Sequence, residues 1–181
     1  NRYDGYQFII YRNNPKDSNS LSNNFVSDIV QDNEGNLWIA TRNGLNKFDR
    51  KTDRFIHYLH NAADHHSISS NSLNKLALDA DGNLWIATVT EGLECFDIKK
   101  NIFKHYLHAD AERASLSDNN VLTVYKDSKH RLWAGTLNGG LNLFDKETGS
   151  FIKFPNKEAG TGKLTGKNIR CIFEDSRQQL W

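Results

Sequence analysis

The feature that most constrains the fold is a motif that returns at a nearly constant interval. The string DNEGNLWIAT at residues 32–41 recurs as DADGNLWIAT at 79–88, as DSKHRLWAGT at 127–136 and as DSRQQLW at 175–181. The tryptophans stand at positions 38, 85, 133 and 181, so they are spaced by 47, 48 and 48 residues. Self-similarity at such a period indicates a repeat architecture, in which each unit packs mainly on its neighbours.

Each unit divides into four short apolar runs separated by turn residues. Around the first tryptophan the runs are FVSDIVQD (25–32), LWIAT (37–41), GLNKFD (44–49) and DRFIHYLH (53–60). None shows the 3.6-residue period of a helix, and LWIAT is rich in strand formers. We therefore expect an all-β chain of four-stranded antiparallel units, with strand positions A to D. A unit of this length is typical of a β-propeller blade, whose Trp and Phe side chains pack between neighbouring blades.

Alignment of the copies sets the expected boundaries. Residues 25–60, 61–108 and 109–155 are expected to form whole blades around Trp38, Trp85 and Trp133. Residues 1–24 supply strands C and D of another blade and a loop, and 156–181 supply strands A and B around Trp181. The chain is thus interpreted as a fragment of about four blades from a larger propeller. Its two half-blades should either join each other or pair with another copy, since open strand edges invite association.

Two kinds of connection carry recognisable turn chemistry. Asp-x-x-Gly-Asn between strands A and B predicts a tight turn, with Asp32 as the acceptor and Gly35 at positive φ. His130 and Gln178 replace this glycine in the later copies, which predicts a different turn there. The connection from strand D to the next strand A carries Ser-Leu-Ser-x-Asn. We expect its hydroxyl and amide side chains to bond the backbone of the same loop.

Composition excludes several classes of function. Lys and Arg number 23 and Asp and Glu 22, so the net charge of +1 gives no indication of a nucleic-acid partner. The apolar runs are too short to cross a membrane, and Cys95 and Cys171 are expected to be free thiols. HYLH occurs at 57–60 and at 105–108, but residues i and i+3 of a strand point to opposite faces, so we interpret these histidines as polar decoration of an outer edge.

The full pattern is S-L-S-x-N-x-V-x-x-I-x-x-D-x-x-G-N-L-W-I-A-T-x-x-G-L-x-x-F-D, and it resembles the two-component regulator propeller repeat along the whole chain. The resemblance implies the periplasmic sensor region of a hybrid two-component histidine kinase, in a propeller of seven blades. It implies an extracytoplasmic module that binds a nutrient-derived ligand, an oligosaccharide, and has no catalytic role of its own. Two alternatives stay open: a propeller enzyme of the streptogramin-lyase type, and a protein-interaction scaffold.

Candidate ligand-binding residues lie in the connections that differ between copies. In propellers the B–C turns and D–A loops open on one face, and variable loops on a regular scaffold are typical of recognition. Amide, carboxylate and guanidinium groups there can make directed hydrogen bonds to sugar hydroxyls. No catalytic residue, cofactor or metal ligand is predicted. The candidates are Arg42, Asn43, Thr90, Glu91 and Asn138 from the turns, and His65, His66 and Asn71 from a D–A loop.

Overall fold

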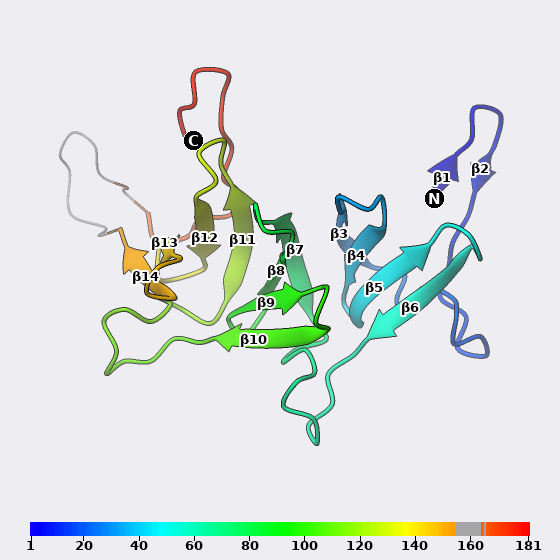
Figure 1. The fold of residues 1–181 in the computed structure, drawn as a ribbon, viewed down its shortest axis with the longest axis horizontal. Helices are drawn as coiled ribbons and strands as arrows, with labels where there is room; N and C mark the ends of the chain where they lie inside the picture. The colour runs from blue at the N-terminus through cyan, green and yellow to red at the C-terminus, as the bar shows by residue number, and fades with distance from the viewer. Residues whose placement is uncertain (155–163, 165) are drawn as a thin grey trace.

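Three four-stranded antiparallel sheets follow one another along the chain, each built from consecutive strands (Figure 1). The computed structural model describes residues 1–154, 164 and 166–181. The first sheet contains β3 (Val26–Gln31), β4 (Leu37–Thr41), β5 (Gly44–Asp49) and β6 (Arg54–Tyr58). The second contains β7 (Leu73–Leu78), β8 (Leu84–Thr88), β9 (Leu93–Asp97) and β10 (Ile102–Tyr106). The third contains β11 (Val121–Lys126), β12 (Leu132–Thr136), β13 (Leu141–Asp145) and β14 (Ser150–Lys153).

These strands occupy the positions A to D that the repeat predicts, and the described residues contain no helix. The all-β, four-stranded architecture is therefore confirmed. In each sheet the first strand pairs with the second, the second with the third and the third with the fourth, so every connection within a sheet is a hairpin. The described part of the chain also has no helix that could span a membrane.

The two ends of the chain form shorter hairpins. At the N-terminus β1 (Arg2–Tyr3) pairs with β2 (Phe8–Ile9), at the positions expected for strands C and D. At the C-terminus Glu174 pairs with Leu180 in an antiparallel bridge, flanked by two backbone hydrogen bonds between Phe173 and Trp181, so the segments expected for strands A and B meet as a short hairpin. The first residues of the expected range 156–181 lie outside the described ones. No third strand lies beside this pair among the described residues, and a two-stranded hairpin alone is marginal in water.

The sheets stand side by side in an open arc (Figure 1). The N-terminal and C-terminal hairpins lie far apart in this view, so the two half-blades do not join within one chain. Of the two outcomes expected from the sequence, joining within one chain is not seen, and pairing with another copy stays a prediction.

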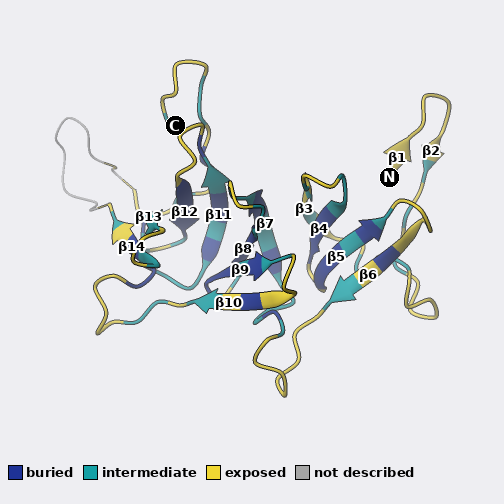
Figure 2. Ribbon diagram, viewed as in Figure 1, coloured by how far each residue is buried: buried dark blue, intermediate teal, exposed yellow. Residues whose placement is uncertain are grey.

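The hydrophobic core lies between neighbouring sheets, and Figure 2 shows that the buried residues concentrate in the strands. Trp38 of β4 is fully buried in a cluster with Leu73 and Leu76 of β7, the first strand of the next sheet. Trp85 of β8 is in turn buried with Val121 and other residues of the third sheet. Packing of strand position B against the next strand position A thus helps to join successive blades, together with the neighbouring A strands, because no blade can cover both of its faces alone.

The aspartate that opens each motif holds the tryptophan that closes it. Asp32 Oδ1 accepts the backbone N–H groups of Glu34 and Asn36, at 3.0 and 2.9 Å, and so caps the turn. Its other oxygen accepts the Trp38 indole N–H at 2.9 Å. The same indole–carboxylate bond recurs in the other three copies: Asp79–Trp85 at 2.9 Å, Asp127–Trp133 at 2.9 Å and Asp175–Trp181 at 3.0 Å.

The expectation of a different turn at His130 and Gln178 is wrong. Both residues adopt positive φ, 62° and 61°, where the first copy has Gly35 at 85°. The backbone hydrogen bonds are also the same: His130 N donates to Asp127 O at 3.0 Å, as Gly35 N donates to Asp32 O at 3.0 Å. The hydrogen bonds of the capping aspartate impose the turn, and they outweigh the small conformational free-energy cost of a left-handed non-glycine residue.

Candidate functional site

The B–C turns and D–A loops do share one face of the arc, because they are hydrogen-bonded to one another. The N–H of Gly44 donates to Asn71 O at 2.7 Å, and the N–H of Gly92 donates to Asn119 O at 2.9 Å. Each B–C turn is thereby bound to the D–A loop that precedes the next sheet. The expected face therefore forms, and it brings together chain segments that are about 27 residues apart.

The D–A loops are built by their own polar side chains, as predicted. Ser67 Oγ lies within hydrogen-bonding distance of two backbone carbonyls of the loop, Asn61 O at 3.1 Å and Asp64 O at 2.8 Å. Ser20 and Ser115 make the same pair of contacts in the other two loops. Asn71 Oδ1 accepts the N–H of His60 at 2.8 Å, so this candidate ligand residue already has a structural partner.

The candidates of the first B–C turn lie against their own scaffold. The Arg42 guanidinium sits over the Phe25 ring, 5.1 Å from its centroid, and 3.4 Å from both Ser72 Oγ and Asn74 Oδ1. Asn43 Nδ2 donates to Ser22 O at 3.3 Å. Both candidates are exposed and accessible from solvent. Because of these contacts, part of the hydrogen-bonding capacity of both side chains is already used within the protein.

The candidates of the other turns are exposed and less constrained. Thr90 and Glu91 contact each other, with Thr90 Oγ1 3.2 Å from Glu91 Oε1. Asn138 is held through its backbone N–H, which donates to Asp118 Oδ2 at 2.8 Å. His65 and His66 lie at the exposed tip of the D–A loop, and the N–H of His66 donates to Asp64 Oδ1 at 2.9 Å.

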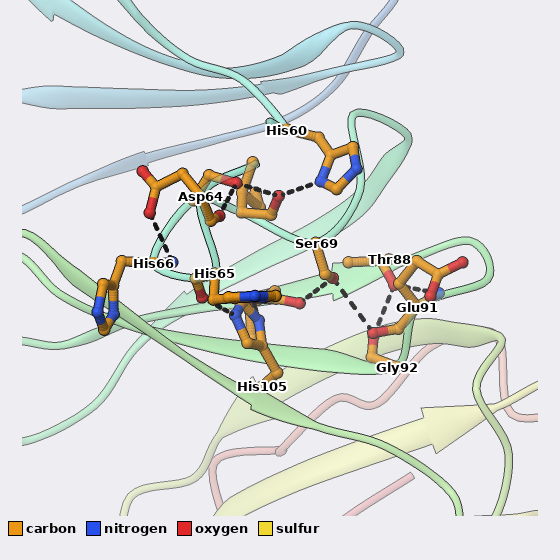
Figure 3. A network of polar contacts seen from close by, with 12 residues as sticks. His60, Asp64, His65, His66, Ser69, Thr88, Glu91, Gly92 and His105 are labelled. Atoms are coloured by element: carbon orange, nitrogen blue, oxygen red, sulfur yellow. Dashed lines mark hydrogen bonds and ion pairs between the residues drawn. The ribbon is translucent and has the colours of Figure 1, made fainter. Parts of the chain in front are cut away.

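One hollow, of about 290 Å³, brings two of the candidates together (Figure 3). It lies between the D–A loop that follows β6 and the B–C turn that follows β8. His65 lines it from the loop and Glu91 from the turn, whereas Arg42, Asn43 and Asn138 are not part of its lining. His60, Asp64, Ser69 and His105 also line it.

Two of the larger hollows are less suited to a polar ligand. One, of about 350 Å³, is apolar and lies over Val26 and Ile29 of β3. Their counterparts Leu73 and Leu76 are covered by the preceding sheet, so this hollow is an uncovered packing surface. The other, of about 410 Å³, lies by the A–B turn of the second sheet, away from the face of the variable turns.

Sequence reasoning missed the buried carboxylate to which two lining residues of the 290 Å³ hollow, Ser69 and His105, are hydrogen-bonded. Glu94 of β9 is fully buried, and its carboxylate accepts hydrogen bonds from Ser69 Oγ and from His105 Nδ1, the latter at 2.5 Å. His105 Nε2 lies 3.1 Å from the backbone carbonyl of His65 (Figure 3). The hydrogen bond to Glu94 raises the pKa of His105 to about 9, although partial burial opposes this.

The histidines of both HYLH strings are therefore structural, and their interpretation as edge decoration is wrong. His57 Nε2 bonds Ser20 O at 2.6 Å, while His60 Nδ1 and His108 Nδ1 bond Ile68 O and Leu116 O, at 2.9 and 2.6 Å. A sequence signal for the buried pair did exist. Glu94 stands at a position of the repeat that is occupied by asparagine in the first and third sheets, as Asn46 and Asn142. Within the described ranges no three His, Cys, Asp or Glu side chains are arranged to hold a metal ion.

Comparison with known proteins agrees with the repeat. A family model described as two component regulator propeller matches residues 20–43, 67–90 and 115–138. The extracellular domain of a putative hybrid two-component system from B. thetaiotaomicron is similar in structure, with a TM-score of 0.78 and 32% sequence identity. That match covers 88% of this chain but 22% of the other.

A second structural likeness concerns the fold alone. Virginiamycin B lyase from Staphylococcus aureus has a TM-score of 0.62 at 12% identity, covering 86% of this chain and 47% of the lyase. A search of the curated proteins gives no significant match.

Proposed function

This chain carries two-component regulator propeller repeats, and from them we propose that it is a ligand-sensing module of a hybrid two-component signalling protein. The similarity to the extracellular domain of such a system supports a position outside the cytoplasm, and we propose the periplasm. The module binds its ligand without transforming it, and signalling chemistry belongs to other parts of the protein. The chain spans about a fifth of the similar structure, so neighbouring blades contribute to the complete sensor.

The observation that carries the proposal is the 290 Å³ hollow on the face of the variable turns. Its volume is close to the lower end of the roughly 300–1,000 Å³ of known ligand pockets. The carboxylates of Asp64 and Glu91 line it, and both accept hydrogen bonds. His105 adds no free donor, since both of its ring nitrogens already face acceptors.

An acceptor-rich hollow suits a ligand that is rich in donors and not anionic. A neutral oligosaccharide has this chemistry, because every hydroxyl can donate. We propose that one sugar unit occupies the hollow. Further units extend over the neighbouring turns, where Arg42, Asn43 and Asn138 are exposed.

The experiment is a thermal-shift screen against neutral oligosaccharides, because a ligand that binds the folded state raises the apparent stability. With a ligand in hand, Glu91→Ala should weaken binding several-fold to about a hundredfold, since one hydrogen bond is worth about 0.5–3 kcal/mol. Arg42→Ala should also weaken it, with some loss of stability from the stacked Phe25. The matched control is Lys51→Ala, an exposed side chain in a C–D turn.

Equal affinity of the Glu91→Ala and parent proteins would remove the hollow as the ligand site. Nothing in the described residues favours a lyase over a binding module, because the likeness to virginiamycin B lyase is confined to the fold. Turnover of a streptogramin by the protein would contradict a purely sensory role.

A further inference from the structure

Strand position C carries one fully buried polar residue in each sheet: Asn46, Glu94 and Asn142. In the first and third sheets the amide meets a loop serine in two ways. Asn46 Oδ1 accepts the N–H of Ser22 at 2.9 Å, while Asn46 Nδ2 donates to Ser22 Oγ at 2.7 Å. Asn142 repeats both bonds with Ser117, at 3.0 and 2.8 Å. A carboxylate cannot donate, so the second sheet needs another arrangement.

In the second sheet a hydroxyl and an imidazole supply the hydrogen-bond donors that the buried Glu94 carboxylate needs. Ser69 Oγ and His105 Nδ1 donate to the two oxygens of Glu94, and His105 lies directly opposite Glu94 in the strand register. The other ring nitrogen of His105 faces a backbone carbonyl, that of His65. Both bonds form together only if both ring nitrogens carry protons, which is the imidazolium form. A buried carboxylate also requires such a partner to be tolerated.

The first sheet has a similar tie, since His57 Nε2 bonds the carbonyl of Ser20 in its own D–A loop at 2.6 Å. What distinguishes the second sheet is that the histidine is also paired with a buried carboxylate. The bonds inside the loop are common to all three, because Ser20, Ser67 and Ser115 make the same ones. The residue opposite Asn46 is His57, and the residue opposite Asn142 is Lys153, so neither sheet places a carboxylate against a histidine here. The bond from His105 to His65 joins residues 40 positions apart and ties the loop tip to β10.

We propose that the Glu94–His105 ion pair is the positioning element of the hollow. Glu94 keeps His105 a double donor, and His105 in turn holds the His65 carbonyl and the exposed segment 61–66 beside β10. Asp64 and His65 line the hollow from this segment and His105 lines it from the strand, so the bond sets its width. The effect on a ligand rests on the proposed function, whereas the tie between loop and strand does not.

The pair makes the loop sensitive to protonation. His60, Asp64, His65 and Glu91 are the other ionisable residues around the hollow, and among the described contacts only Glu94 bonds the His105 ring through a side chain. The raised pKa of His105 means that its stabilising contribution is fully present below about pH 6.5 and is lost as the pH rises through about 9. Above that range one of the two bonds must be given up.

The test is Glu94→Asn, which installs the residue that the other two sheets carry and should therefore fold. NMR titration should show the pKa of His105 falling from about 9 toward its ordinary value of 6.5. Hydrogen-exchange protection factors of residues 61–66 should fall several-fold at pH 7.5, since charge-assisted hydrogen bonds are roughly twice as strong as neutral ones. At pH 5.5 His105 is charged in both proteins whether the loop is open or closed, so protection against local opening should be nearly unchanged, even though the pair still contributes to the free energy of global unfolding.

His57→Gln in the first sheet is the matched control and should leave residues 61–66 unaffected. Titration of His105 near pH 6.5 in the parent protein would overturn the proposal without any variant. An equal loss of protection at both pH values would also overturn it, because that result indicates a packing defect rather than a charged tie. For any oligosaccharide that binds, Glu94→Asn should weaken affinity more at pH 7.5 than at pH 5.5. If no sugar binds, the proposed function fails while the exchange result still tests the tie.

Discussion

Replacement of Trp85 by alanine tests whether packing between blades holds the protein together. Trp85 is 3% exposed. Its ring stacks on Tyr106, with centroids 5.4 Å apart and planes at 22°, and its centroid is 4.6 Å from that of Phe144. Removal of a buried aromatic side chain costs about 3–5 kcal/mol. We expect Trp85→Ala to lower the free energy of unfolding by an amount in this range.

The repeat itself supplies the control. Trp181 occupies the same place in its motif and donates the same indole N–H to an aspartate, at 3.0 Å, but it is 73% exposed. Trp181→Ala removes the hydrogen bond without opening a cavity, so it should cost less than about 1 kcal/mol. The difference between the two alanine variants therefore measures burial rather than the turn.

A third variant separates the indole N–H from the ring. Trp85→Phe keeps most of the apolar contact but removes the donor to Asp79, whose carboxylate retains the N–H of Asn83 at 2.9 Å and the side-chain amide of the same residue at 2.9 Å. We expect a loss of about 1–3 kcal/mol, the range for a hydrogen bond to a charged group or an unsatisfied partner. This loss should lie between those of the two alanine variants.

The assay is urea unfolding followed by circular dichroism, which does not depend on the substituted fluorophore. A shift of the midpoint at constant m-value reports a change in stability alone. Equal losses for Trp85→Ala and Trp181→Ala would refute the reasoning, since the two sites differ chiefly in burial.

Two further predictions concern the thiols and the exposed apolar face. Burial raises the pKa of Cys95 to about 12, whereas Cys171 is exposed. The thiolate is the nucleophile in reactions with disulfide reagents. At pH 8 such a reagent should therefore modify Cys171, and it should react with Cys95 on the order of a thousandfold more slowly. Comparable rates in single-cysteine variants would contradict this. Val26 and Ile29 are 39% and 55% exposed, so we expect concentration-dependent self-association by light scattering, reduced in Ile29→Lys. A single monomer mass at all concentrations would count against it.

The sequence by itself determined the features that repeat. The spacing of the tryptophans, the strand runs and the Ser-Leu-Ser-x-Asn loops identify four-stranded blades, because each of these devices acts between residues close in sequence. The Asp32 turn and the bonds of Ser67 were predictable for the same reason. The position of His65 and Glu91 on one face also followed from the order of strands. Where prediction failed at His130, it relied on the identity of one residue and underestimated the capping aspartate beside it.

The tertiary structure decided what depends on register between strands. Glu94 is a visible exception in the repeat, but its meaning requires knowing that His105 lies opposite it and that the His65 carbonyl comes back to the same ring. The hollow likewise exists because a D–A loop and a B–C turn of different hairpins meet. Contacts of this kind depend on the relative placement of segments, and a local sequence pattern carries no information about that placement. The buried ion pair and the shape of the candidate site therefore emerge only when the blades are packed together.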